Sequence, residues 1–206
     1  MKKTIQLLAI ALAVSFTALL GGCASQPAAE GRALYDLGTL PAPRNSAVPS
    51  ALPPISVAEV RAPPWLDSRT MFYRLSYAND QQPRPYANSR WSMPPAQLFG
   101  HRLKSRLGQA GAAVLSASDG VANVPMLRVD ADDFTQIFTS PGQSFVRVSV
   151  RASVLNGRML AANRNFTREV PAPTPDAAGG AKALAEAGDA VITEMIDWLA
   201  GLPLKK

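Results

Sequence analysis

Alternating apolar and polar residues give the clearest structural signal in the chain, between residues 127 and 170. Alternation with a period of two is typical of strands with one buried face. One such strand is predicted over 127–138, where a change of register at Asp132-Asp133 indicates a β-bulge. A second is predicted over 146–154, with valine and alanine on one side and arginine and serine on the other. Because that second side is polar, we expect helices to cover only one face of the sheet.

The Asn156-Gly157 pair is typical of a type I′ hairpin turn and predicts a third strand over 158–170. The polar stretch 79–85 is predicted to be a loop, and 171–180 a second loop. Shorter apolar segments predict further strands at Ala33–Leu40, Ile55–Val60, Met71–Tyr77 and Ala112–Ser116.

Two segments have the three-and-four spacing of amphipathic helices. The first begins at Pro94-Pro95, which suits a first helical turn, and runs to about Gln109. Its polar face carries Arg102, Lys104 and Arg106. The second carries the stripe Leu184, Ala187, Val191, Met195, Trp198 and Leu202. Together the elements predict an α+β fold, an antiparallel-rich sheet of six or seven strands with two helices packed on one face.

The N-terminus has a different pattern, with Lys2 and Lys3 before an uncharged, mostly apolar run from Leu7 to Leu20. A basic start, a short apolar core and small residues at the cleavage point are typical of an export signal. The apolar run is shorter than the roughly 20 residues of a membrane-spanning helix. The following Gly21-Gly22-Cys23 resembles the end of the lipobox of bacterial lipoproteins. An ordinary secretory signal with an incidental cysteine and an uncleaved anchor are the alternatives.

The lipobox resemblance implies that Cys23 receives a diacylglycerol, that the chain is cut before it, and that the new amine is acylated, with palmitate the expected acyl chain. This divides the chain into a signal peptide at 1–22, a lipidated tether at 23–33, and a single periplasmic domain at 34–206. Ala24 and Ser25 follow the cysteine, without the aspartate that resembles an inner-membrane retention signal. We therefore expect the protein on the outer membrane, facing the periplasm.

Composition narrows the possible partners. Without 1–22, the remaining 184 residues carry 19 basic and 15 acidic side chains, since Lys2 and Lys3 are the charged residues of the signal. This mild excess is dispersed, with no run of five Lys or Arg, so nucleic-acid binding is not expected. Cys23 is the only cysteine, so no disulfide within the chain is expected.

The sequence offers little catalytic chemistry. His101 is the only histidine and lies within the first predicted helix, where an exposed surface position is expected. The chain has no Gly-rich phosphate loop and no HExxH motif. Asp130, Asp132 and Asp133 suggest calcium ligands, but the oxygen-rich loop with its glycine is missing, so a solvated strand edge is the better account. We predict no enzymatic activity, no cofactor and no metal.

Residues 62–95 instead have the composition of a recognition surface, with two of the three tryptophans and three of the four tyrosines. The candidate partner-binding residues are Trp65, Tyr86, Arg90 and Trp91. The alternative is that Trp65 and Trp91 cap the open ends of the core. Arginines in and beside this region, among them Arg61, Arg74, Arg84 and Arg90, suit acidic partners or lipid head groups.

This segment also resembles the ABC-type transport auxiliary lipoprotein family, whose members are encoded with MCE-type lipid transport systems. The resemblance rests on Tyr35-Asp36-Leu37-Gly38, Ala62-Pro63-Pro64-Trp65-Leu66-Asp67, Met71-Phe72-Tyr73-Arg74-Leu75, Tyr77-Ala78, Tyr86, Ser89-Arg90-Trp91 and Pro94-Pro95. It continues through the strand pair of 127–155 to the closing helix. The resemblance implies a lipoprotein that assists an inner-membrane ABC transporter and a ring-forming MCE protein. It transfers no catalytic residues, and Cys23 is the one site that it carries over.

Three hypotheses follow. The first is a docking subunit that holds the conduit of the transporter against the outer membrane. The second is a lipid-binding carrier with a cleft between sheet and helices, although the apolar stripes are about what a core of this size uses. The third is a structural envelope lipoprotein without a transport role. The sequence does not decide whether the protein self-associates into a ring.

Overall fold

The computed structural model describes residues 31–40, 42, 52–121 and 123–204. The signal peptide, Cys23 and most of the tether lie outside these residues, so the predictions for them remain predictions. From Arg32 onward the described residues form one compact unit.

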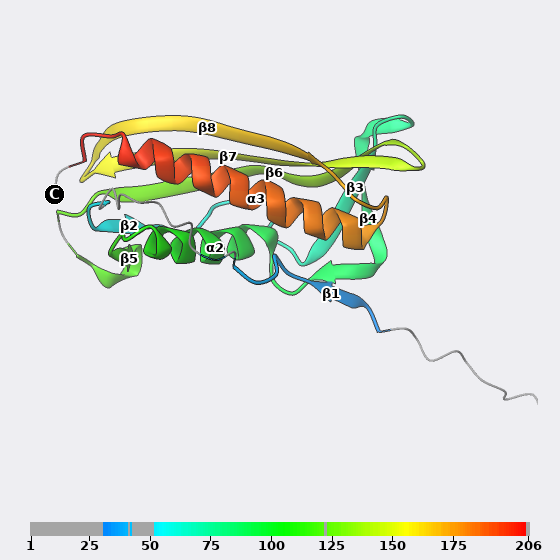
Figure 1. Cartoon of the computed structure of the whole chain (residues 1–206), viewed down its shortest axis with the longest axis horizontal. Coiled ribbons are helices and arrows are strands. Elements are labelled where there is room, and N and C mark those ends of the chain that lie inside the picture. The colour runs from blue at the N-terminus through cyan, green and yellow to red at the C-terminus, as the bar shows by residue number, and fades with distance from the viewer. Residues whose placement is uncertain (1–30, 41, 43–51, 122, 205–206) are drawn as a thin grey trace, which may run out of the picture. The chain divides into compact units, whose positions relative to one another are not determined.

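Three long antiparallel strands form one side of the sheet, with β8 at its edge: β6 (Met126–Ser140), β7 (Gln143–Asn156) and β8 (Met159–Pro171) (Figure 1). The register of β6 against β7 shifts between Ala131 and Asp133, which confirms the predicted bulge. On the inner face of β7, the valines and alanine at 146–154 are at most 1% exposed. Their alternation therefore identified the core side of the sheet correctly.

The turn between β7 and β8 differs from the predicted type. Asn156 pairs with Met159, so the two central residues are Gly157 and Arg158. Among these, Gly157 has a φ of 60°, and Arg158 has no positive φ. A type I′ turn needs positive φ at both central positions, whereas glycine with positive φ at the first of them is typical of type II′.

Short strands pair in parallel with β6 along the edge opposite β7. β2 (Ile55–Val57) pairs with the start of β6, and β3 (Thr70–Leu75) pairs near its end. β5 (Val114–Ser116) is parallel to β2, and β1 (Ala33–Tyr35) is parallel to β4 (Asn79–Trp91). The result is a mixed sheet of eight strands. The α+β class is confirmed, but the predicted antiparallel-rich sheet of six or seven strands missed the parallel pairs and a strand.

The missed strand is β4 (Asn79–Trp91), which forms an antiparallel ribbon with β3. Residues 79–83 of this ribbon are exposed to solvent. A strand that buries neither face needs no apolar alternation, and this explains why 79–85 was wrongly predicted to be a loop.

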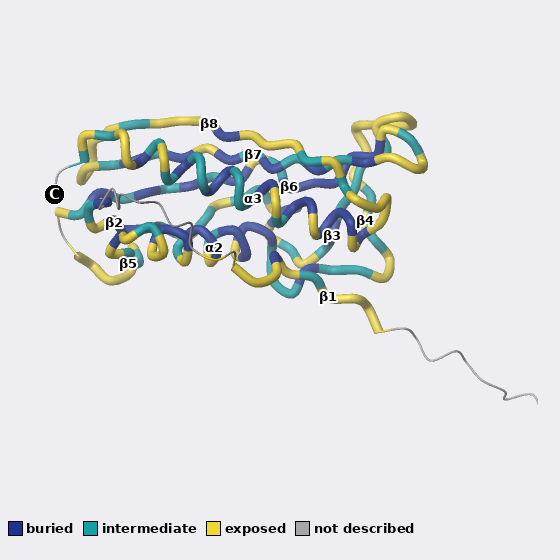
Figure 2. Tube along the Cα trace, viewed as in Figure 1, coloured by how far each residue is buried: buried dark blue, intermediate teal, exposed yellow. Residues whose placement is uncertain are grey.

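Two helices cover one face of the sheet: α2 (Pro95–Gln109) and α3 (Ala177–Ala200). Figure 2 shows the buried residues gathered between the helices and the long strands. Leu103 and Leu107 of α2, with Val191 and Met195 of α3, have no exposed surface. None of the helices in the described part of the chain has the length and apolar character that crossing a membrane requires.

The predicted polar face of α2 is wrong for two of its three cations, since Arg102 is 7% exposed and Arg106 9%. The Arg102 guanidinium donates to both carboxylate oxygens of Asp189 on α3, at 2.7 and 2.6 Å. It also donates to the carbonyl oxygens of Leu37 and Gly38, at 2.9 and 3.1 Å, and more weakly to that of Thr39. Arg102 therefore joins both helices to the N-terminal segment, in an arrangement that we call the Arg102 clamp.

Helix α3 begins at Ala177, so the last four residues of the loop that was predicted over 171–180 are helical. Its N-cap is Asp176, whose carboxylate accepts a hydrogen bond of 2.8 Å from the backbone N–H of Gly179. Thr174 donates to the same carboxylate at 2.8 Å. A Cβ on Gly180 would overlap the side chain of buried Gln136, so the first turn needs glycine there to approach the sheet.

This cap makes a pH-dependent contribution to stability. The Gly179 N–H, followed by the Thr174 hydroxyl, lowers the pKa of Asp176 from its ordinary value of 3.8. The contribution of the carboxylate is therefore present above that value and is lost as pH falls through the lower folded pKa. We expect Asp176→Ala to reduce the free energy of unfolding by about 1 kcal/mol at neutral pH.

Urea denaturation at about pH 7 and about pH 3 measures this effect. The control is Asp176→Asn, which keeps a capping oxygen without a titratable charge. The advantage of the wild type over Asp176→Asn is expected to shrink at the lower pH. An unchanged advantage would assign the stabilisation to hydrogen bonding alone.

Candidate functional site

A basic hollow lies where β1, β4 and β3 run side by side. Its volume is about 390 Å³, and its lining includes Arg32, Arg69, Thr70, Tyr86, Ser89 and Arg90. We call it the arginine hollow. Two of the predicted partner-binding residues, Tyr86 and Arg90, are therefore brought together here.

Strand pairing explains how three arginines reach one place. β4 is the middle strand, with β1 on one side and β3 on the other. Ser89 of β4 pairs with Ala33, the residue after Arg32, and Arg90 pairs with Thr70, the residue after Arg69. Arg32 and Arg69 therefore flank Arg90 from opposite sides. Their convergence depends on pairing between distant segments, so the sequence alone did not identify Arg32 or Arg69 as site residues.

The arginine hollow carries uncompensated positive charge. Within the described residues, the guanidinium groups of Arg32, Arg69 and Arg90 form no ion pair, and no carboxylate belongs to the described lining. Arginines that do contact a carboxylate are Arg61, Arg102, Arg147, Arg151 and Arg168. The arrangement therefore suits an anionic ligand, because each guanidinium has donors to offer.

Tyr86 forms a wall of the hollow, and its side chain is fixed by a hydrogen bond and by an aromatic contact. Its hydroxyl donates to the Gln136 side-chain oxygen at 2.8 Å, and the Gln136 amide donates to Ser144 at 2.8 Å. The Tyr86 ring lies 4.6 Å from that of Tyr73, measured between centroids. Burial, and then the nearby Tyr73 and Asp176, raise the pKa of Tyr86. The phenol therefore remains neutral and serves to position the wall.

The other two predicted residues lie elsewhere. Trp91 is 1% exposed and packs edge-to-face on Phe134, with 5.6 Å between ring centroids. Its prediction as a contact residue was therefore wrong, and the alternative of a core role holds, because an indole enclosed on all sides offers no surface to a partner. Trp65 is half-buried, lies edge-on to Phe72 at 6.2 Å and does not line the hollow.

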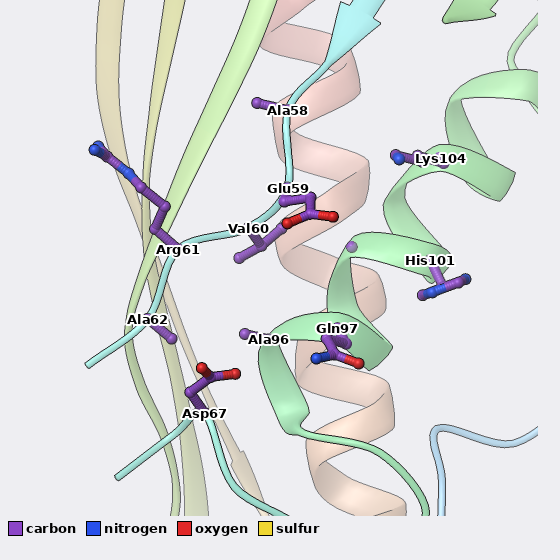
Figure 3. Close-up of a pocket in the computed structure, with 11 residues that line it drawn as sticks. Ala58, Glu59, Val60, Arg61, Ala62, Asp67, Ala96, Gln97, His101 and Lys104 are labelled. Atoms are coloured by element: carbon purple, nitrogen blue, oxygen red, sulfur yellow. The ribbon is translucent and has the colours of Figure 1, made fainter. Parts of the chain in front are cut away.

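A second hollow, of about 630 Å³, lies between α2 and the segment that follows β2 (Figure 3). Glu59 and Asp67 line it from the segment after β2 and the loop beyond, and His101 and Lys104 from α2. Both signs of charge are present, so this surface does not select strongly for an anion or a cation. His101 is exposed, in agreement with the prediction from its place on the helix.

The aspartates of β6 were weighed as calcium ligands, and each faces an arginine. Asp130 contacts Arg61 at 2.7 Å, and Asp132 lies 3.7 Å from Arg151. Asp133 lies 4.0 Å from Arg147, and burial raises the pKa of its carboxyl group. Across 31–40, 42, 52–121 and 123–204, no three His, Cys, Asp or Glu residues are grouped so as to hold a metal ion.

Solved structures share this fold. Protein XCC0632 from Xanthomonas campestris, of the family DUF330, superposes with a TM-score of 0.70 at 21% identity, over 80% of this chain and 93% of that chain. An uncharacterized protein superposes with a TM-score of 0.66 at 18% identity, over 82% of this chain and 99% of that one. At these identities the likeness establishes the fold alone. Comparison with curated protein sequences gave no match.

The sequence supplies the family. The model of the ABC-type transport auxiliary lipoprotein component matches residues 35–196, from the first strand to the last turns of α3. The match includes strands β2 to β8, helix α2, most of α3, and the lining of the arginine hollow except Arg32. The chain therefore belongs to the ABC-type transport auxiliary lipoprotein family.

Proposed function

We propose that the protein is the non-catalytic docking component of an ABC-type transport system for lipids or other hydrophobic molecules. In this proposal Cys23 anchors it in the outer membrane, and the domain faces the periplasm. Its partners are an MCE-type ring protein and the inner-membrane ABC transporter, whose ATPase supplies the energy. The observation that carries the proposal is the family match over residues 35–196.

The packing of the domain favours docking over carrying a lipid. The apolar stripes of α2 and α3 are used against the sheet, where Leu103, Leu107 and Ile192 have no exposed surface. The hollow beside α2 is lined by Glu59, Asp67 and Lys104, which are poor neighbours for an acyl chain. A rigid domain with polar surfaces suits a component that holds other proteins in place.

The anchor makes docking effective. Three acyl chains of about 15 methylenes each, at roughly 0.8 kcal/mol per buried methylene, give about 36 kcal/mol as an upper bound on the free energy of membrane anchoring. A fraction of that free energy retains the protein on its membrane. Its partners then meet a component held at one surface, and this raises their effective concentration.

An affinity capture from detergent-solubilised envelopes tests the function. The mature chain, purified with its native N-terminus, is the bait, and mass spectrometry identifies the captured proteins, the captured lipids and the acyl groups on Cys23. We expect an MCE protein or ABC subunits. Recovery of stoichiometric phospholipid without those proteins would make the chain a carrier. Recovery of neither phospholipid nor partner proteins would indicate a structural lipoprotein.

Substitution of Trp65 tests whether this residue contributes to partner capture, with Trp198 as a matched control. Trp65 and Trp198 are both half-buried and both lie edge-on to a phenylalanine, at 6.2 Å and 5.6 Å between centroids. We expect Trp65→Ala to reduce partner capture and Trp198→Ala to leave it unchanged at a similar loss of thermal stability. Equal capture by both variants would remove Trp65 from the docking surface.

A further inference from the structure

We propose that the arginine hollow binds the phosphate group of an anionic membrane phospholipid. The inference goes beyond docking to partner proteins, since it concerns the contact of the domain with its own membrane. It rests on the proposed function in one respect, the anchor at Cys23 that keeps the domain near lipid. The binding chemistry itself depends on the described residues alone.

The donor set of the hollow matches a phosphodiester. A guanidinium presents N–H groups in a planar fork that fits two phosphate oxygens, and three such groups line the hollow. Thr70 and Ser89 add hydroxyl groups to the same lining. The arginines lie within β4 or directly before β1 and β3, so their backbones are held by the sheet before any ligand arrives.

The arginines of the hollow differ in their pairing from those on the outer face of β7. On β7, Arg147 contacts Glu169 at 2.7 Å, and Arg151 lies 3.7 Å from Asp132. These side chains have carboxylates that satisfy them within the protein. Within the described residues, the arginines of the hollow have no such partner, so an external anion is the group that would neutralise them.

The place of the hollow in the chain selects a lipid as the source of the phosphate. Arg32 follows Cys23 by nine residues, a reach of at most about 32 Å when fully extended. The hollow therefore begins where the tether joins the folded domain. Basic side chains near an anionic bilayer are attracted to it, and the attraction is confined to about one Debye length, roughly 8 Å at physiological salt.

Titration of the mature full-length chain in a non-ionic detergent tests this inference. The probes are dihexanoyl phosphatidylglycerol, dihexanoyl phosphatidylcholine and inorganic phosphate, with binding followed by calorimetry. Hydrogen exchange of 69–70 and 85–90 locates the site. We expect phosphatidylglycerol to bind and to protect these residues. Inorganic phosphate binding as tightly would overturn the lipid assignment, and equal binding of phosphatidylcholine would overturn the role of anionic charge.

Two double variants distinguish binding at the hollow from attraction by the overall positive charge of the protein. Arg69→Gln with Arg90→Gln is expected to weaken phosphatidylglycerol binding at least about tenfold, through the loss of two charge-assisted contacts. The matched control, Arg147→Gln with Arg151→Gln, removes the same charge from β7 and is expected to change the affinity by less than about twofold. Equal losses in the two double variants would overturn the proposal.

Arg32→Gln provides a third variant for the case in which the first double variant fails to fold, because Arg32 is exposed at the start of β1. Its affinity is expected to fall in the same direction. These titrations are independent of protein partners. A wild-type chain that captures ABC or MCE proteins but does not bind phosphatidylglycerol would refute the lipid site alone. A wild-type chain that binds phosphatidylglycerol at the hollow but captures neither protein would refute the docking function alone.

Discussion

Replacing Asp189 with alanine is expected to lower the free energy of unfolding by about 3–5 kcal/mol, because it leaves the buried Arg102 guanidinium without its counter-charge. The Arg102 side chain is 6% exposed and that of Asp189 19%, so solvent screens the pair weakly. Three carbonyl oxygens remain as acceptors, but none carries a full negative charge.

Denaturant unfolding followed by circular dichroism measures this loss, which corresponds to a fall in Tm of about 10 °C for a chain of this size. Asp197→Ala is the control, since it removes an exposed carboxylate from the same helix. The double variant Arg102→Met, Asp189→Leu is expected to recover part of the stability, because it removes both buried charges. A loss below about 1 kcal/mol for Asp189→Ala would mean that the carbonyl groups alone satisfy Arg102.

Trp91→Ala is expected to cost about 3–5 kcal/mol, the range for truncating a fully buried aromatic side chain. The indole is enclosed beside Phe134, and its removal leaves a cavity in a rigid part of the core. The Trp91 backbone N–H donates to the Arg69 carbonyl at 2.8 Å, so the cavity lies directly behind the arginine hollow.

Equilibrium unfolding is again the measurement, and partner capture is the counter-test. Arg90→Ala is a neighbouring control, because Arg90 is half-buried and has no ion pair within the described residues. It is expected to change stability by less than about 1 kcal/mol. A Trp91→Ala protein that melts like the wild type but loses its partners would restore Trp91 to the recognition surface.

The elements that sequence patterns predicted well are those with one wet and one dry face. Helix α2 has the predicted start and end, since proline marks its first turn and apolar spacing its buried side. Strand β7 alternates because α3 covers one side of it, and its other side is partly open to solvent. In both cases the burial that stabilises the element also produces its pattern.

The failures have the opposite cause. Residues 79–83 bury neither face, and the strands β2 and β5 have three residues each, too few to reveal a pairing direction. Arg102 was assigned to the polar face of α2 together with Lys104 and Arg106, because charged side chains are usually exposed. Its partner Asp189 is 87 residues away in the sequence, and no local pattern predicts such a pair.

The candidate site was predicted in part for the same reason. Tyr86 and Arg90 belong to an aromatic and basic stretch that composition identifies, whereas Arg32 and Arg69 lie in other segments and join them through strand pairing. Trp91 shows the limit of composition, because a tryptophan at an interface and one in a core have the same letter. Neighbouring residues of a strand face opposite sides of the sheet, so Arg90 lines the hollow while Trp91 faces the core. This distinction can be made only after β4 is known to be a strand.

The Arg102 clamp determines where the domain resists mechanical tension. A force that pulls on Arg32 loads the three residue pairs between β1 and β4 first, together with the bond from the Ser92 N–H to the Tyr35 carbonyl. Directly behind them, the backbone at Leu37 and Gly38 is tied through Arg102 to both helices. Tension is therefore expected to pass into the helical layer within seven residues of Arg32, so that the three residue pairs of β1 do not bear it alone.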